Sequence, residues 1–233
     1  MNRKNLRSLA AGVALLLAVG ALAGCGGEKK ADDSKKMVTV GIAQLVEHGA
    51  LDAANKGFVA GMASKGFKEN ENVKYDRQNA QADQSNLQNI AQRFVSNKVD
   101  LICAIATPTA QTMANATKDI PIVATAGTDY EVAKLAASNN EPKGNVTGTS
   151  DMNPIDQQLE LLLKIAPQTK NIGTVYSSSE VNSQLQVDVL KKLAGDKGIN
   201  VIEATVSTVN DIQQAAHSLV GNCLLYTSDA ADE

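Results

Sequence analysis

An alternation of apolar, strand-like runs with helix-like segments is the feature that most constrains how this chain folds. The strand-like runs are short, and residues 99–106 are almost wholly apolar, which is typical of a strand covered on both faces. The segments between them carry apolar residues at helical spacing. Strands that alternate with helices imply right-handed crossovers and a parallel sheet, so the pattern predicts an α/β fold.

The alternation falls into two blocks. The strands expected in the first block are residues 38–45, 72–77, 99–106, 120–125 and 145–149, and its helices are 51–66, 83–97 and 108–118. The strands expected in the second block are residues 171–176 and 199–205, and its helices are 153–167, 181–194 and 211–220. We therefore expect two lobes, residues 37–147 and an incomplete second lobe at 148–222, each a parallel sheet flanked by helices.

The start of the chain predicts export. A basic segment is followed by an apolar run, residues 9–23, that is shorter than the roughly 20 residues a spanning helix needs. These features describe a secretory signal peptide over residues 1–24. Leu22-Ala23-Gly24-Cys25 matches a bacterial lipobox, in which Cys25 is acylated on sulfur after cleavage; the alternative is an ordinary signal peptide with a chance cysteine.

Residues 25–36 are small and charged, so we expect a disordered tether that leads to the folded part. A lipid on Cys25 would hold the protein at a membrane, because acyl chains insert their apolar surface into the bilayer. The expected location is therefore the outer face of the bacterial cell membrane or the periplasm.

The composition argues against several functions. The formal net charge is -3 and no basic cluster follows the tether, so nucleic-acid binding is not expected. Aromatic residues make up 3% of the chain, with no Trp, which weakens a sugar-binding interpretation because sugars usually stack on aromatic faces. The two His residues lie far apart and no zinc spacing occurs, so no metal or cofactor is expected. Nucleophile-elbow, phosphate-loop and dinucleotide motifs are also missing from the sequence, so we do not expect an enzyme.

The end of the chain departs from the alternation. After residue 222 the pattern requires a buried strand, whereas the chain reads Cys-Leu-Leu-Tyr-Thr-Ser-Asp-Ala-Ala-Asp-Glu. A second lobe with so few strands leaves an open sheet edge. We therefore expect residues 223–233 to be a non-native tail on a piece of a longer protein. The alternative is a native ending in which residues 224–227 form a strand.

Several motifs carry a resemblance to a known family. They are Gly41-Ile42-Ala43-Gln44 with Glu47-His48-Gly49-Ala50-Leu51-Asp52, Asn79-Ala80-Gln81-Ala82-Asp83-Gln84-Ser85-Asn86, Ala104-Ile105-Ala106-Thr107-Pro108, Gly144-Asn145-Val146-Thr147-Gly148-Thr149-Ser150-Asp151 and Asn210-Asp211-Ile212-Gln213-Gln214-Ala215-Ala216. Over residues 38–222 the chain resembles the ABC-transporter substrate-binding lipoproteins of the tryptophan/tyrosine-binding type. The resemblance implies a two-lobe periplasmic-binding-protein fold of the first type that closes on a small ligand, with an aromatic amino acid as the family expectation. It also implies delivery of the ligand to a membrane permease driven by an ATPase.

Polar side chains follow the expected strands, where ligands of parallel α/β sheets bind. Glu47 and His48 follow the first strand. Thr107, Pro108 and Thr109 follow the third, and we expect Thr107 to cap a helix that begins at Pro108. Free backbone N–H groups at that helix start suit a ligand carboxylate, and the threonine hydroxyls can add donors.

Two further loops complete the candidate site. Thr125 and Asp129 flank the loop after the fourth strand. The loop after the first strand of the second lobe offers hydroxyls, a carboxylate for an amino group, and an amide, from Ser177, Ser178, Ser179, Glu180 and Asn182. A ligand that is met by the loops of both lobes would close the protein around itself.

Each candidate has a structural alternative. Thr107-Pro108 is a good helix start with or without a ligand, and Asp129 is also suited to begin a helix. Ser177 and Glu180 fit a capping box, which would use both side chains locally. The Glu47-His48 pair leaves open a hydrolase, although a loop histidine is more often a surface or capping residue. A ligand-sensing receptor module without transport is the alternative function; a permease and an ATPase gene beside this gene would favour import.

The lipobox leads to a first prediction. We expect Cys25→Ser to leave an unprocessed precursor without attached fatty acid, because the acylated sulfur is missing. Metabolic labelling with a radioactive fatty acid and gel mobility measure both properties. Equal labelling of the unchanged chain and of the variant would contradict the assignment.

Overall fold

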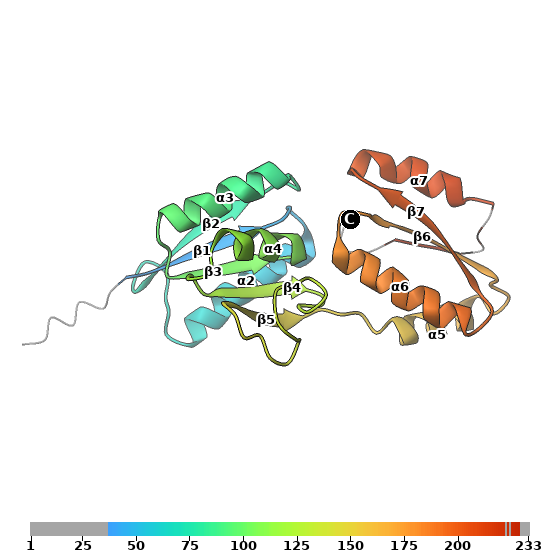
Figure 1. Cartoon of the computed structure of the whole chain (residues 1–233), viewed down its shortest axis with the longest axis horizontal. Coiled ribbons are helices and arrows are strands. Elements are labelled where there is room, and N and C mark those ends of the chain that lie inside the picture. The colour runs from blue at the N-terminus through green and yellow to red at the C-terminus, as the bar shows by residue number, and fades with distance from the viewer. Residues whose placement is uncertain (1–36, 222, 224, 229–233) are drawn as a thin grey trace, which may run out of the picture. The chain divides into compact units, whose positions relative to one another are not determined.

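The computed structural model describes residues 37–221, 223 and 225–228, and Figure 1 shows the order of its elements. The predicted signal peptide, Cys25 and the tether lie outside the described residues. In the described part of the chain, no helix has the length and the apolar character needed to cross a membrane.

The first sheet consists of five parallel strands in the order β2-β1-β3-β4-β5. Its strands are β1 (Val38–Gln44), β2 (Val73–Asn79), β3 (Leu101–Ile105), β4 (Ile122–Gly127) and β5 (Val146–Ser150). The helices that belong to it are α2 (Gly49–Ser64), α3 (Gln84–Ser96) and α4 (Thr107–Ala116). The predicted parallel α/β order of this region is confirmed.

Helices cover both faces of the first sheet. Phe94 of α3 and Met113 of α4 are fully buried in one cluster of core residues, and Leu51 of α2 belongs to a second cluster with Ile42 and Ile105. Strands covered in this way need apolar side chains on both faces, which is why β3 reads as a continuous apolar run.

The second sheet has three parallel strands in the order β7-β6-β8. Its strands are β6 (Asn171–Ser177), β7 (Asn200–Val206) and β8 (Leu225–Ser228). Its helices are α5 (Ile155–Ile165), α6 (Val181–Gly195) and α7 (Ile212–Leu219), which follows the short 3₁₀ helix η1 (Val209–Asp211). Ile172 of β6 packs with α5 and α6, and Val175 of the same strand packs with α7, as the alternation of side chains along a strand requires.

The helix ends follow ordinary capping chemistry in several places. His48 caps α2, because its Nδ1 accepts a hydrogen bond from the backbone N–H of Ala50. Asp83 caps α3 by accepting from the N–H of Asn86 at 2.7 Å. Gly66 and Gly198 follow the ends of α2 and α6 with φ of 89° and 69°, a conformation that glycine adopts without strain.

Two predicted helix starts need correction. α4 begins at Thr107 itself, with Ala106 as its N-cap residue and no side-chain cap among the described residues, so Thr107 does not cap the helix. α5 begins at Ile155, two residues later than the expected start at residue 153, with Pro154 as its N-cap residue, and the side chain of Asn153 donates to Gln186. A proline in the first turn, or just before it, has no N–H to satisfy, which lessens the need for a capping side chain.

The boundary between the sheets lies later than expected. β5 was divided by the expected lobe boundary at residues 147 and 148, whereas all of it belongs to the first sheet. Ser150, which lies beyond that boundary, still pairs with Gly127 of β4. The first sheet therefore ends only after Ser150.

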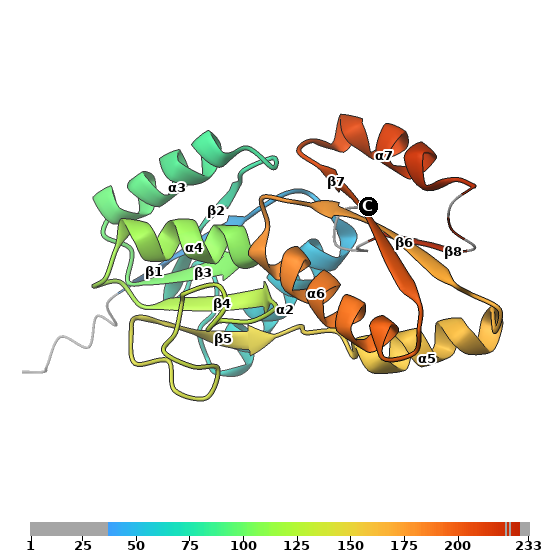
Figure 2. The same ribbon diagram turned by 45° about the vertical axis from the view of Figure 1, so that its right-hand side comes forward.

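Part of the expected tail lies in a strand. β8 pairs in parallel with β6 from Ile172 with Leu225 to Val175 with Ser228, and Figure 2 shows the two strands side by side. This is the strand of the alternative interpretation, one residue later. Parallel pairing uses backbone groups, which a foreign segment also has. The expectation that residues 223–233 are not native therefore stays a prediction.

The packing of β1 against α3 leads to a stability prediction. A Cβ placed on Gly41 would lie 2.7 Å from a ring carbon of the fully buried Phe94. Gly41→Ala should therefore lower the free energy of unfolding by about 1–3 kcal/mol, as overpacking of a filled core does. Gly57→Ala is the control, because a Cβ there has no described atom within 4 Å; it should raise stability by about 0.5–1 kcal/mol. Urea unfolding measures both, and equal midpoints would contradict the prediction.

Candidate ligand-binding site

The candidate residues lie at the carboxyl edges of the two sheets. In the first sheet the ends of three neighbouring strands are in register, with Gln44 beside Ile105 and Ile105 beside Thr125. From β1 the chain adds β2 on one side and β3 on the other, and from β6 it adds β7 on one side and β8 on the other. Such a reversal leaves a crevice at the carboxyl ends of the strands, where ligands of open α/β sheets bind.

Gln44 anchors the loop after β1. Its Nε2 donates to Val46 O at 2.8 Å and to Asp52 Oδ1 at 2.7 Å, while its Oε1 accepts from Asn55 Nδ2 at 3.2 Å. The side chain is buried and uses both of its N–H donors and its acceptor. The loop and the start of α2 are therefore held on the end of β1.

This loop carries Glu47 and His48, and the two residues differ. Glu47 is exposed. The Nδ1 of His48 is occupied by the N–H of Ala50 at 3.2 Å, which is the capping role considered for it. A histidine engaged in this way has only its other nitrogen for further contacts, which weakens the acid/base alternative.

The turn from β3 to α4 is conformationally strained. Ala106 has φ of 85° and ψ of 152°, a combination that is costly for any residue with a Cβ. Its N–H donates to Thr125 O at 3.0 Å and its carbonyl accepts from Ala110 N at 3.1 Å. Thr107 is buried, and its Oγ1 accepts from Thr128 N at 3.4 Å. The bonds from Ala106 to Thr125 and from Thr128 to Thr107 therefore hold the strained turn on the end of β4.

The first turn of α4 holds an unpaired hydroxyl. Thr109 is 0% exposed, and its Oγ1 has no hydrogen-bond partner among the described residues. Buried polar atoms are almost always paired, so such an exception needs an explanation. Pro108 occupies the same turn, half-buried. The first turn of α4 thus combines a hydroxyl with backbone N–H groups that no side chain caps. Groups of this kind at a helix start bind anions.

Thr125 and Asp129 have different surroundings. Thr125 is half-buried, and its Oγ1 lies 3.4 Å from Thr149 Oγ1. Asp129 accepts from Val132 N at 2.8 Å with one oxygen and from Asn139 Nδ2 at 2.9 Å with the other. Asp129 is followed by a series of turns, so it fastens the connection from β4 to β5 and does not begin a helix.

The loop after β6 presents its polar groups differently from the prediction. Glu180 is the N-cap residue of α6 and makes no side-chain cap, so Ser177 and Glu180 do not form the capping box. Ser177 Oγ instead lies 2.9 Å from Ser179 Oγ, and Ser178 and Ser179 are exposed. Asn182 donates to Glu180 Oε2 at 3.3 Å, while its own Oδ1 is buried without a hydrogen-bond partner among the described residues.

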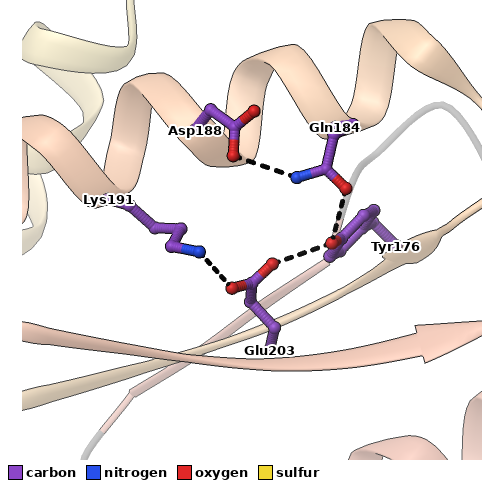
Figure 3. Close-up of polar contacts among 5 residues, drawn as sticks. All are labelled: Tyr176, Gln184, Asp188, Lys191 and Glu203. Carbon is purple, nitrogen blue, oxygen red and sulfur yellow. Dashed lines mark hydrogen bonds and ion pairs between the residues drawn. The ribbon is translucent and has the colours of Figure 1, made fainter.

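A polar network adjoins this loop (Figure 3). The hydroxyl of Tyr176 lies 2.8 Å from Glu203 Oε2 and 2.9 Å from Gln184 Oε1. Glu203 accepts from Lys191 Nζ at 2.5 Å, and Gln184 donates to Asp188 at 3.0 Å. The network ties β6 and β7 to α6, so it fixes the residue before the Ser177 loop relative to the helix after it.

Charge and burial set the protonation of this network. The hydrogen bond from Lys191, followed by that from Tyr176, lowers the pKa of Glu203. Burial, followed by the hydrogen bond to Glu203, raises the pKa of Tyr176. The carboxylate is therefore ionised and the phenol neutral at pH 7, which matches an O–H donor to a carboxylate acceptor.

Several residues that shape the site were not found from the sequence. Gln44 had a usable signal, because a polar residue closes an otherwise apolar strand. Ala106 and Asn182 had none, since neither a strained backbone nor a missing partner is visible in a residue's identity. Glu203 lies inside an expected strand and contacts Tyr176 only through the pairing of β6 with β7.

The fold and the position of the loops define a class. Two parallel sheets flanked by helices, with polar loops at their carboxyl edges, form the periplasmic-binding-protein fold of the first type. Residues 39–227 match the family described as "ABC transporter substrate binding protein", and the chain belongs to this family.

Known proteins support the assignment. The chain is 48% identical over 228 residues to the tyrosine-binding protein of Clostridioides difficile (strain R20291), a match that covers 94% of this chain and 65% of that protein. A solved structure from Streptococcus pneumonia, in complex with L-Trp, is 38% identical with a TM-score of 0.81; the match covers 84% of this chain and 66% of that one. A conserved domain protein from Vibrio cholerae is 40% identical with a TM-score of 0.80, and the match covers 82% and 64%.

The network of Figure 3 leads to a prediction about pH. Glu203→Gln should lower the free energy of unfolding at pH 7 by about 1–2 kcal/mol, because two hydrogen bonds to a partly exposed charged acceptor are weakened. The pKa of Glu203 is lower in the folded chain than its ordinary value of 4.5, so its contribution is complete above that value and is lost as the pH falls through the folded pKa.

Thermal melts between pH 7 and pH 3 measure this effect. The difference between the unchanged chain and Glu203→Gln should disappear at the acid end of the series. Glu160→Gln, at an exposed position of α5, is the control and should match the unchanged chain throughout. A difference that does not depend on pH would show that the charge of Glu203 is not what matters.

Proposed function

We propose that this protein is the ligand-capturing component of an ABC importer. It binds an aromatic amino acid at the carboxyl edges of its two sheets and delivers the ligand to a permease that an ATPase drives. The family is one of solute-binding proteins rather than enzymes. The chain spans 65% of the length of the tyrosine-binding relative, so ligand and partners are proposed here for the protein as a whole.

The first turn of α4 is the observation that carries the proposal. A buried hydroxyl without a partner costs about 1–3 kcal/mol, and the strain at Ala106 adds a cost of similar size. We infer that a ligand carboxylate binds at this turn, where it accepts from the hydroxyl of Thr109 and from backbone N–H groups. Binding of an anion would supply the missing hydrogen-bond partner and so offset the free-energy cost that the ligand-free fold carries.

The second sheet supplies groups of the complementary kind. The carboxylate of Glu180 and the hydroxyls of Ser177, Ser178 and Ser179 suit an ammonium group, and the unpaired Oδ1 of Asn182 is a further acceptor. We propose that Glu47, His48 and Thr125 line the same ligand from the first sheet, whereas Asp129 supports its loop. Relatives that bind tyrosine and tryptophan support an aromatic side chain on the ligand.

Lipid attachment at Cys25 would place this binding reaction outside the cytoplasm. A tethered protein captures solute near the permease, because a lipid anchor restricts its diffusion to the membrane surface. The tether of residues 25–36 would then set how far the folded part reaches.

Isothermal titration calorimetry of the purified chain tests the function. L-tryptophan or L-tyrosine should bind, whereas L-leucine should bind much more weakly. Tryptamine and tyramine, which lack the carboxylate, should lose binding by about a hundredfold or more, as expected for the loss of a charged hydrogen-bonded group. Absence of binding to all of the amino acids would contradict the proposal.

Thr109→Val separates ligand binding from stability. The two side chains have nearly the same shape, and the substitution removes a hydroxyl that has no partner among the described residues. The ligand-free variant should therefore be at least as stable as the unchanged chain, while its affinity for tryptophan or tyrosine should fall about tenfold. Thr147→Val, at an exposed position of β5, is the control and should change neither property. A destabilised variant with unchanged affinity would assign the hydroxyl a structural role.

A further inference from the structure

A buried tyrosine bonds two neighbouring strands of the first sheet. Tyr130 is 7% exposed, and its hydroxyl lies 3.1 Å from Ala124 O on β4 and 2.9 Å from Thr149 O on β5. Burial, with a contribution from the charge of Asp151, raises the pKa of Tyr130 to about 12, so the phenol is neutral and its O–H faces the two carbonyls as a donor.

Two glycines make room for this hydroxyl. A Cβ at Gly148 would lie 2.3 Å from Tyr130 Oη and 2.1 Å from Ala124 O. A Cβ at Gly127 would lie 3.0 Å from the same hydroxyl. Gly127, Gly148 and Tyr130 are therefore matched in size. Any side chain at Gly148 would displace the phenol.

The hydroxyl binds where β4 is irregular. The register between β4 and β5 shifts between Ala124 and Gly127. Inside this shift Ala126 has φ of 52°, in the left-handed region that residues with a Cβ rarely adopt. Tyr130 bonds to Ala124 O, where the shift begins on β4, and to Thr149 O, which faces the shift on β5, and these bonds oppose relaxation to a regular strand.

The irregular segment of β4 is connected to the start of α4. Thr125 O accepts from the N–H of Ala106, the strained residue before α4. Thr128 donates its N–H to Thr107 Oγ1, and its carbonyl accepts from Ser150 Oγ at 2.6 Å. A shift of this segment would therefore be passed to the turn where the carboxylate is proposed to bind.

We propose that Tyr130 is a positioning residue for ligand binding. Its hydroxyl holds Ala126 in the left-handed conformation, and this segment of β4 holds the start of α4 in its strained conformation. Tyr130 acts through Thr125 and Ala106 rather than through contact with the ligand. The inference rests on the proposed function, because ligand affinity is its main consequence.

Tyr130→Phe tests the role of the hydroxyl, since it keeps the ring in the core. At a temperature where the variant is fully folded, its affinity for L-tryptophan should fall about five- to tenfold, the effect of losing one such bonded group. Adding Ala126→Gly should restore most of that affinity, because glycine adopts a positive φ without a Cβ to hinder it. A residue with only a structural role would lower the melting temperature without this loss and recovery of affinity.

Tyr75→Phe is the matched control. Tyr75 is also 7% exposed, and its buried hydroxyl has no hydrogen-bond partner among the described residues, so the substitution should leave the affinity unchanged. Affinity of Tyr130→Phe within twofold of the unchanged chain would overturn the proposal. So would a loss of affinity that Ala126→Gly does not reduce.

Hydrogen exchange separates this proposal from the proposed function. The amides of Ala106 and Asp151 donate to Thr125 O and Gly127 O, on either side of Ala126. Both amides should exchange faster in Tyr130→Phe than in the unchanged chain and in Tyr75→Phe. If the unchanged chain binds no amino acid, the proposed function fails. The exchange rates alone then decide whether Tyr130 holds the β4 segment and the start of α4 in place. Equal exchange in all three proteins overturns it.

Discussion

Parallel strand pairing is the constraint on which the other features of this structure depend. Each sheet gathers its strand-to-helix turns at one edge, which brings Gln44, Ile105 and Thr125 side by side although they are distant in the sequence. The crossover helices cover both faces of the sheet, so the middle of β1, residues 40–43, and all of β3 are apolar. In these two central strands, polar side chains are left to the ends, and the position of the candidate site follows from how the core is buried.

The carboxyl edges also hold strained backbone and buried polar atoms without a described partner. Ala106 and Ala126 have unfavourable backbone conformations there, and the buried polar atoms of Thr109 and Asn182 have no described partner. An unpaired atom alone does not mark a site, because the hydroxyl of Tyr75 is also unpaired and lies within β2. What distinguishes Thr109 and Asn182 is that each lies in the first turn of a helix at a carboxyl edge, in a turn whose N-cap residue makes no side-chain cap. A ligand that satisfies such groups has more to gain than on a relaxed surface.

The sequence predicts elements well and their junctions poorly, for a physical reason. Strands such as β3 and helices such as α3 are determined by burial periodicity and by local capping, for example by Asp83, and both are visible in a short window of residues. The start of α4, the irregularity at Ala126 and the position of Tyr130 are determined by bonds between strands that only the assembled sheet brings together. The same holds for the loop after β6, where the expected capping box is absent because α6 begins at Val181 and Glu180 takes the N-cap position. The general location of the candidate site could therefore be predicted, whereas the groups that support it could not.

The two carboxyl edges differ in the charge of the groups they offer, and this difference bears on the ligand. At α4 the available groups are a hydroxyl and backbone N–H donors, and no described basic side chain is needed to favour an anion there. At α6 the loop carries the carboxylate of Glu180, which accepts from Asn182, and the unpaired oxygen of Asn182, and both groups favour a cation. A ligand with one charge of each sign would satisfy both edges, whereas a simple acid or a simple amine would satisfy only one. Under the proposed function, an amino acid stabilises the ligand-bound conformation by the sum of two contacts that neither edge supplies alone, and that difference in affinity is what drives closure.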